Sequence, residues 1–271
     1  MCETPRPEAN MADDFMHREL ASVGKRVFRL GLAVNYGIDE EGVRAAIGRG
    51  VNYFFDTFRS GSLKAPLRDV LKSRRDDFVV ATLPLIGYFG GSVRRGAERT
   101  LRRLGTDYLD IYQLGWLGVT SAWTDATLTE LRHLKESGKV RALGVSIHDR
   151  ERAGKLADDS PLDLLMIRYN AAHPGAERDI FPHLAKRKPA VVAYTATSWR
   201  KLLRRPKGWS GPIMTAGDCY RFCLTSPHVD VVLTGPASKE QLDQNIAAFE
   251  KGPLTGEEIG WMRDFGKAVY A

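Results

Sequence analysis

The segment Val51–Gly61, VNYFFDTFRSG, decides how the chain is interpreted. Its first five residues are mostly apolar and run directly into Asp56, and the polar loop Thr57–Gly61 follows. A buried strand that ends in a carboxylate and a polar loop places a reactive group at the edge of a hydrophobic core. We therefore predict that Asp56 marks the working face of the fold.

The same pattern, an apolar strand followed by a helix, continues along the chain. The predicted strands are Val27–Ala33, Val51–Asp56, Phe78–Leu83, Leu109–Leu114, Val140–Ser146, Leu162–Ile167, Ala190–Thr195 and Val229–Leu233. Helical patterns separate them, including one over Gly175–Arg187 that Pro182 interrupts. Strands that are apolar along their length are typical of a parallel sheet covered on both faces. Eight such units predict an α/β fold, a (β/α)8 TIM barrel.

We expect one barrel domain over residues 26–271, with an extra C-terminal helix at Thr255–Val269. No linker divides the chain, and no Gly-rich dinucleotide fingerprint follows the first strand, which disfavours an open nucleotide-binding sheet. Residues 1–25 are predicted to be a flexible N-terminal tail, because the first fourteen are polar and contain proline without a hydrophobic signal region.

Composition narrows the functional classes. The net charge is +7, but the basic residues are scattered over predicted helices and no nucleic-acid-binding motif occurs, so we expect no nucleic-acid partner. No apolar run is long enough to span a bilayer, so we expect no membrane. The three cysteines argue against a disulfide scaffold and favour the cytoplasm. Cys219 and Cys223 are interpreted as packing, with no metal site.

The active site of a TIM barrel lies at the carboxyl ends of its strands. His148 and Arg168 stand at two of these ends, and Trp116 and Trp199 are placed to line a pocket. The alternatives are that His148 is a solvent-exposed residue at a helix start, and that Arg168 forms a structural salt bridge with Glu177. A monomer or weak homo-oligomer acting on a small molecule is expected.

At this point the sequence resembles the aldo-keto reductases, from about Leu30 to Phe249. The segments that carry the resemblance are GVNYFFDT (50–57), LRRLGTDYLDIYQLGW (101–116), GKVRALGVS (138–146), the pair Tyr169-Asn170, VVAYT (191–195) and VDVVLTGPASKEQLDQNIAAF (229–249). The resemblance implies a reductase of carbonyl compounds that binds NADP(H) in extended form across the barrel mouth.

The resemblance also implies the positions of the cofactor contacts. Ser146 corresponds to a residue that holds the nicotinamide carboxamide, Tyr194 to the ring that stacks on it, and Thr195 to a pyrophosphate contact. The region that would hold the adenosine 2′-phosphate contains Gly235, Ser238, Lys239, Gln241 and Asn245. Independently, the helix start near Ser238 offers free N–H groups and a favourable dipole for an anion. A simple helix cap is the alternative for Ser238.

The catalytic positions depart from the family pattern. Asp56 corresponds to the family's catalytic Asp, but Ser60 and Gly61 stand where its Tyr is expected. Leu83 replaces the Lys, and Gly115 replaces the His. Two cofactor positions also differ, with Met166 in place of an amide residue and Ile147 in place of Asn.

Without the lysine, a buried Asp56 must find another cation or its pKa must rise. Arg59 and Arg168 are the expected partners. Three functions follow. The first is an aldo-keto-reductase-like oxidoreductase whose proton donor is drawn from His148, Arg168 and Tyr36. The alternative is a catalytically silent barrel that binds NADP(H) or another anionic ligand as a sensor or partner subunit. The third is non-redox chemistry at Asp56, Arg168 and His148.

Overall fold

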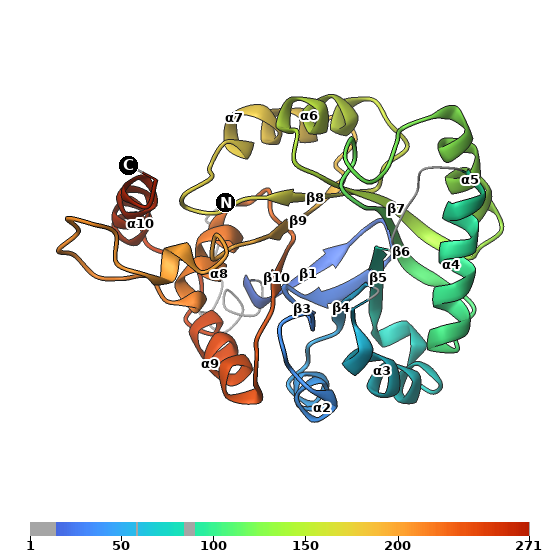
Figure 1. The fold of residues 1–271 in the computed structure, drawn as a ribbon, viewed down its shortest axis with the longest axis horizontal. Coiled ribbons are helices and arrows are strands. Elements are labelled where there is room, and N and C mark those ends of the chain that lie inside the picture. The colour runs from blue at the N-terminus through green and yellow to red at the C-terminus, as the bar shows by residue number, and fades with distance from the viewer. Residues whose placement is uncertain (1–14, 58, 84–89, 271) are drawn as a thin grey trace, which may run out of the picture.

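The fold is a closed barrel of eight parallel strands (Figure 1). The computed structural model describes residues 15–57, 59–83 and 90–270. The barrel strands are β3 (Leu30–Ala33), β4 (Tyr53–Thr57), β5 (Val79–Leu83), β6 (Leu109–Leu114), β7 (Val140–Ile147), β8 (Leu164–Arg168), β9 (Ala190–Tyr194) and β10 (Val231–Thr234). Each pairs with the next in the chain, and β10 closes the ring against β3. The predicted TIM barrel is confirmed.

Helices surround the barrel on its outside (Figure 1). They are α2 (Glu40–Gly48), α3 (Lys64–Leu71), α4 (Gly90–Leu104), α5 (Asp125–Glu136), α6 (Arg150–Asp158), α7 (Ala176–Asp179), α8 (Ala216–Thr225), α9 (Lys239–Phe249) and α10 (Gly256–Ala268), with short 3₁₀ turns at Gly61–Leu63, Arg75–Asp77, Phe181–Leu184 and Lys201–Leu203. The helix predicted over Gly175–Arg187 is α7 plus a 3₁₀ turn that contains Pro182. None of the helices in the described part of the chain has both the length and the apolar character needed to cross a membrane.

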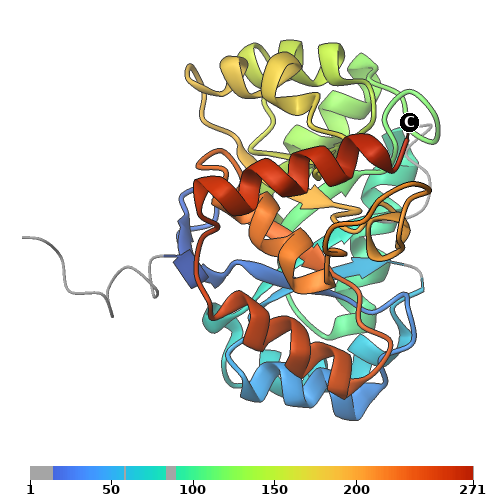
Figure 2. The ribbon, with the colours of Figure 1, turned by 90° about the vertical axis from the view of Figure 1, so that its left-hand side faces the viewer.

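The extra helix α10 lies outside the ring, beside α8 (Figure 2). A capping box starts it: Thr255 Oγ1 accepts from the backbone N–H of Glu258, and the Glu258 carboxylate accepts from that of Thr255. Arg221 of α8 also donates to Glu258, at 3.0 Å. The same glutamate therefore begins α10 and ties it to the barrel.

Strand alternation divides the core into two layers. Tyr53 and Phe55 of β4 point into the barrel and pack with Val79, Ala81 and Ile111, whereas Phe54 points outward into the helix layer. Because successive side chains alternate, this pattern also fixes which side of β4 carries Asp56.

A β-hairpin closes one end of the barrel, and it corrects the predicted flexible tail. Strands β1 (His17–Leu20) and β2 (Lys25–Phe28) pair antiparallel, and Leu20, Val23 and Val27 belong to the inner core. The tail prediction therefore fails for residues 17–25, while residues 1–14 lie outside the described residues. The sequence did not predict the hairpin, because its strands are short and contain charged residues. One of these, Lys25, is paired with Asp110 in the structure.

Two buried cations hold the hairpin. The Lys25 ammonium donates to Asp110 of β6 at 2.7 Å. The Arg29 guanidinium donates to the carbonyls of Phe15, Leu224, Val229 and Asp230. Arg29 also separates β2 from β3, so the single strand predicted over Val27–Ala33 is two.

Candidate active site

Three side chains face the barrel mouth from adjacent strands. Ser146 of β7, Arg168 of β8 and Tyr194 of β9 occupy the inward positions, because Met166 and Val192, two residues earlier on their strands, belong to the inner core. Arg168 and Tyr194 are direct partners in the sheet register. This rim, defined here as the carboxyl ends of β7, β8 and β9, brings together the predicted residues Ser146, Arg168 and Tyr194.

His148 joins this rim through Tyr194. The Tyr194 hydroxyl lies 2.9 Å from His148 Nε2, and the two rings meet edge to face at 5.6 Å. Trp116, half exposed, stands 6.4 Å from the imidazole. Burial, followed by the nearby Arg168 charge, lowers the pKa of His148. Burial raises the pKa of Tyr194 to about 12. The pair therefore joins a neutral imidazole to a protonated phenol at pH 7.

Buried polar groups without partners point into the mouth below this pair. Both amide atoms of Gln113 have no hydrogen-bond partner among the described residues. The Ser146 hydroxyl makes no hydrogen bond of normal geometry there, although it lies near enough to the Tyr194 hydroxyl to lower the pKa of that phenol. Both side chains are fully buried. Unpaired buried polar groups are costly and call for a ligand or ordered water. Gln113 was missed in the sequence, although it stands two residues before Gly115 and shares its inward side.

Asp56 does not face the mouth. It shares the outer face of β4 with Phe54, and its carboxylate accepts hydrogen bonds from Thr82 and Arg103. Arg103 lies on α4, so the predicted partners Arg59 and Arg168 are replaced by a helix residue. Burial nevertheless raises the pKa of Asp56, and Arg103 opposes that rise. The reason the prediction failed is direction: alternation turns Asp56 toward the helices.

The position expected for the family's tyrosine is closed by a small polar network. The Ser60 hydroxyl accepts from the Thr57 backbone N–H at 2.9 Å, and the Thr57 hydroxyl donates to Asn35 Oδ1 at 3.1 Å. Ser60 is buried. The loop after β4 is thus fixed by its own hydroxyls and by Asn35, which follows β3.

Leu83 and Gly115 interlock where the family's lysine and histidine are expected. A Cβ atom on residue 115 would lie 2.7 Å from Leu83 Cδ2, closer than van der Waals contact. Leu83 packs on the inner core. The leucine therefore occupies the space that any side chain at position 115 would need, and the two departures from the family pattern depend on each other.

The loop after β9 has an unusual backbone. Four of its non-glycine residues have left-handed φ angles of 49° to 68°: Thr195, Ser198, Trp199 and Arg200. Such conformations are costly and concentrate at ligand sites. The Asn170 amide supports the loop by donating to the Thr195 carbonyl at 2.8 Å. Thr195 is thus held at the rim, where the sequence placed a pyrophosphate contact.

At the start of α9, the predicted phosphate-binding residues have local partners. Ser238 caps the helix by accepting from the Gln241 N–H, and Gln241 Oε1 accepts from the Ala237 N–H. Asn245 is buried and donates to Thr234 Oγ1 at 3.1 Å. Gly235 lies against the Tyr36 ring, which occupies the space a Cβ would take.

A cavity of about 220 Å³ joins this helix start to that of α2. Lys239 is its one basic residue among the described residues, against three acidic ones, Asp39, Glu41 and Glu240. Carboxylates accept hydrogen bonds from hydroxyl groups and repel a phosphate. The cavity therefore fits the hydroxyls of a ribose better than it fits a phosphate.

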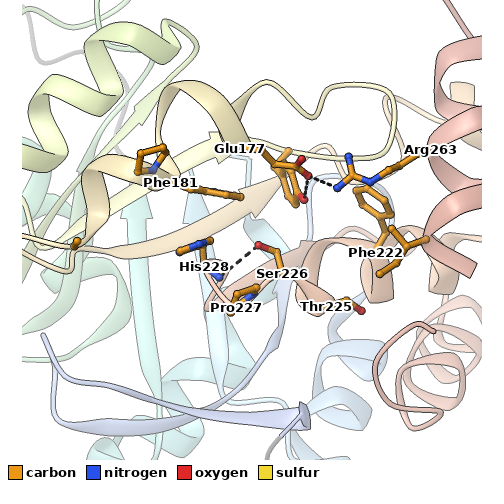
Figure 3. Close-up of a pocket in the computed structure, with 12 residues that line it drawn as sticks. Glu177, Phe181, Phe222, Thr225, Ser226, Pro227, His228 and Arg263 are labelled. Carbon is orange, nitrogen blue, oxygen red and sulfur yellow. Dashed lines mark hydrogen bonds and ion pairs between the residues drawn. The ribbon is translucent and has the colours of Figure 1, made fainter. Parts of the chain in front are cut away.

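A cavity of about 590 Å³ lies away from the rim (Figure 3). It is lined by residues of α7, α8 and α10 and the turn between α7 and β9. Glu177 there accepts from the Tyr169 hydroxyl and from Arg263, each at 2.7 Å. The alternative interpretation of Arg168, a salt bridge with Glu177, is wrong, because among the described residues Glu177 forms its ion pair with Arg263.

Comparisons with known proteins agree with this geometry. The family model described as the Aldo/keto reductase family matches residues 31–204, more than half of the 271 residues. The chain is 24% identical over 282 residues to the "Uncharacterized oxidoreductase YqkF" of Bacillus subtilis, covering 89% of this chain and 91% of that one. It is 31% identical over 213 residues to the "NADH-specific methylglyoxal reductase" of Escherichia coli, covering 66% and 65%. The solved structure of the aldo-keto reductase AKR11C1 from Bacillus halodurans, in its apo form, superposes with a TM-score of 0.76 at 25% identity, covering 93% and 96%.

Proposed function

Because the chain belongs to the aldo/keto reductase family, we propose that it is a nicotinamide-dependent oxidoreductase that interconverts a carbonyl compound and an alcohol at the β7–β9 rim. The observation that carries this proposal is the contact of Tyr194 with His148 beside Arg168. It gathers a proton-transfer group, an aromatic ring and a fixed cation at the site where the family acts.

The residues present fit the nicotinamide end of NADP(H). The Ser146 hydroxyl and the orphaned Gln113 amide are buried polar groups that a carboxamide would satisfy. The half-buried Tyr194 ring is placed to stack on the nicotinamide, and the strained Thr195 loop would lie against the pyrophosphate. When bound, the cofactor supplies or accepts the hydride.

The remaining chemistry falls to the chain's own side chains. In this proposal the protonated form of His148, which is populated below its lowered pKa, gives a proton to the carbonyl oxygen, and the Tyr194 hydroxyl holds the imidazole in place. Arg168 stabilises the negative charge that develops on that oxygen. Asp56, one of the predicted catalytic set, receives a structural part instead, because it joins β4 to α4 on the outer face of the barrel.

A silent barrel is the second candidate, and the Leu83–Gly115 contact favours it. That contact fills the space of two residues on which the family's chemistry depends. Under this alternative the rim binds NADP(H) or another anionic ligand without turnover.

Fluorescence titration tests the proposal first. Trp116 and Trp199 stand half exposed at the rim, so bound NADPH or NADH should quench them. We expect saturable quenching for the wild type and at least about tenfold weaker binding for Tyr194→Ala, since base–aromatic stacking contributes about 1–3 kcal/mol. Tyr108→Phe, at the opposite end of the barrel, is the control. If neither NADPH nor NADH binds saturably, the protein is not a nucleotide binder under either candidate function. Binding without NADPH oxidation across a panel of aldehydes and ketones would favour the silent barrel.

A further inference from the structure

Arg168 carries an uncompensated charge at the rim. It ends β8 on the inward side and is half buried, and no carboxylate among the described residues lies within salt-bridge distance of it. Neighbouring arginines differ: Arg150 pairs with Asp179 at 2.7 Å, and Arg263 pairs with Glu177 at 2.7 Å. A half-buried cation without a counter-charge is costly unless a ligand supplies the anion.

The side chains around Arg168 share its sign or are neutral. A small hollow of about 10 Å³ is lined by Arg168 with Ile147, His148, Arg150, Ile167, His173 and Ile180, and no acidic side chain takes part. A hollow of this size holds about one water-sized group. Burial, together with the charges of Arg168, Lys201 and Arg150, lowers the pKa of His173 to about 4. Because Asp179 already pairs with Arg150, Arg168 supplies the unpaired positive charge among the described residues that line the hollow, and the hollow has room for one oxygen of an anion.

Aromatic rings lie beside the charge. Trp199 lies 5.8 Å from the guanidinium carbon, and Tyr194 is the direct sheet partner of Arg168. His148, the proposed proton donor, lines the same hollow. An anionic group held by Arg168 would consequently lie beside the group that is to be protonated.

We propose that the substrate is a small oxo acid, an aldehyde or ketone with a carboxylate on a neighbouring carbon, and that Arg168 binds this carboxylate. The inference rests on the proposed reductase function. Arginine donates strong charge-assisted hydrogen bonds to carboxylates, and one carboxylate oxygen in the hollow would leave the adjoining carbonyl beside His148. In the reaction the carbonyl carbon gains a hydride from the reduced nicotinamide and the oxygen gains a proton. The carboxylate is unchanged, and the product is a hydroxy acid.

Matched substrates test the proposal. Pyruvate and methyl pyruvate present the same ketone with and without the charge, so the ratio of their kcat/KM values isolates the carboxylate. For the wild type we expect this ratio to favour pyruvate. In Arg168→Gln it should fall by about 30-fold, the range of one lost charge-assisted pair. Arg263→Gln removes an arginine that is already paired with Glu177 and does not line the hollow, and it should change the ratio by less than about threefold.

The outcomes separate the two proposals. Turnover of both compounds with no preference, or a ratio that Arg168→Gln leaves unchanged, would overturn the oxo-acid assignment and leave the reductase intact. An Arg168→Gln variant that weakens NADPH binding while keeping the ratio would assign Arg168 to the cofactor instead, and it also overturns the inference.

Calorimetric binding of oxamate, an unreactive oxo-acid analogue, gives an arm that needs no turnover. Oxamate binding that is lost in Arg168→Gln and kept in Arg263→Gln would support the anion site even if no carbonyl is reduced, in which case only the reductase proposal fails. If oxamate fails to bind to the nucleotide-loaded wild type, the proposed anion site itself is wrong.

Discussion

Leu83 and Gly115 show that single residues at the mouth are coupled by packing. A methyl group at position 115 must displace Leu83 Cδ2, the flexible end of a side chain, so Gly115→Ala should lower the free energy of unfolding by about 1 kcal/mol. Leu83→Ala makes room, so the loss in the double variant should be smaller than the sum of the single losses. Urea denaturation measures all three. Gly61→Ala, in the loop after β4 and with no atom within 4 Å of its Cβ, is the control. Losses that add in the double variant would contradict the contact.

The Asp56–Arg103 pair makes a pH-dependent prediction. Arg103 opposes the rise that burial causes in the pKa of Asp56, so Arg103→Gln should raise that pKa further. A carboxyl whose pKa is higher in the folded state binds more protons there, so stability is lost as pH rises above the unfolded value of about 4. The loss caused by Arg103→Gln should thus be about 3 kcal/mol at pH 7 and clearly less at pH 4.5.

Urea unfolding at the two pH values tests this pair. The double variant Asp56→Asn/Arg103→Gln has no buried carboxyl at position 56, so its stability difference from Asp56→Asn should not depend on pH. A loss for Arg103→Gln that is equal at both pH values would show that Asp56 does not depend on Arg103.

The titration of His148 predicts how the rate of carbonyl reduction depends on pH. As the proton donor it must be protonated, so the rate of carbonyl reduction should be high below its pKa and fall as pH rises through it. Burial and Arg168 place that pKa below the usual value of about 6.5. Arg168→Gln removes one of the lowering charges, so the falling limb of the kcat profile should move up by about one pH unit. A limb that stays in place would exclude His148 as the titrating group.

At the scale of elements, the starts of α2 and α9 make a prediction about the cofactor. Their shared cavity holds Asp39, Glu41 and Glu240 against Lys239, so the acidic groups oppose a 2′-phosphate. Glu240→Gln should therefore improve the affinity for NADPH relative to NADH by about threefold at low salt, and less at high salt. Fluorescence titration with both nucleotides measures the ratio. Glu250→Gln, beyond the far end of α9, is the control, and an unchanged ratio in Glu240→Gln would exclude this cavity as the adenosine site.

Elements also show what the sequence allowed us to predict. The eight strands were predictable because each is apolar along its length and followed by a helical pattern. The β1–β2 hairpin was not, because its stability comes from distant pairs such as Lys25 with Asp110, which no local pattern reveals. Arg103 was missed for the same reason, since a basic residue on an amphipathic helix is ordinarily solvated.

At the scale of the whole molecule, the barrel brings together residues that the chain keeps far apart. Ser146, Arg168 and Tyr194 were predicted at the mouth from strand ends alone, and parallel register placed them side by side. The replaced positions 83 and 115 were also visible in the sequence, but their mutual packing depends on three-dimensional distance. The fold therefore retains the barrel of the family, and under the proposed function a different set of side chains would carry the chemistry.

Transfer of deuterium tests that conclusion most directly. The protein would be incubated with NADPH deuterated at C4 of the nicotinamide and with pyruvate, and the lactate product analysed by mass spectrometry. The proposal predicts one deuterium per product molecule for the wild type, and a rate lowered by at least about 100-fold in His148→Gln, the usual contribution of general acid catalysis. Tyr108→Phe should behave as the wild type. Saturable NADPH binding without any labelled alcohol, from pyruvate or from neutral carbonyl compounds, would show that the barrel is silent.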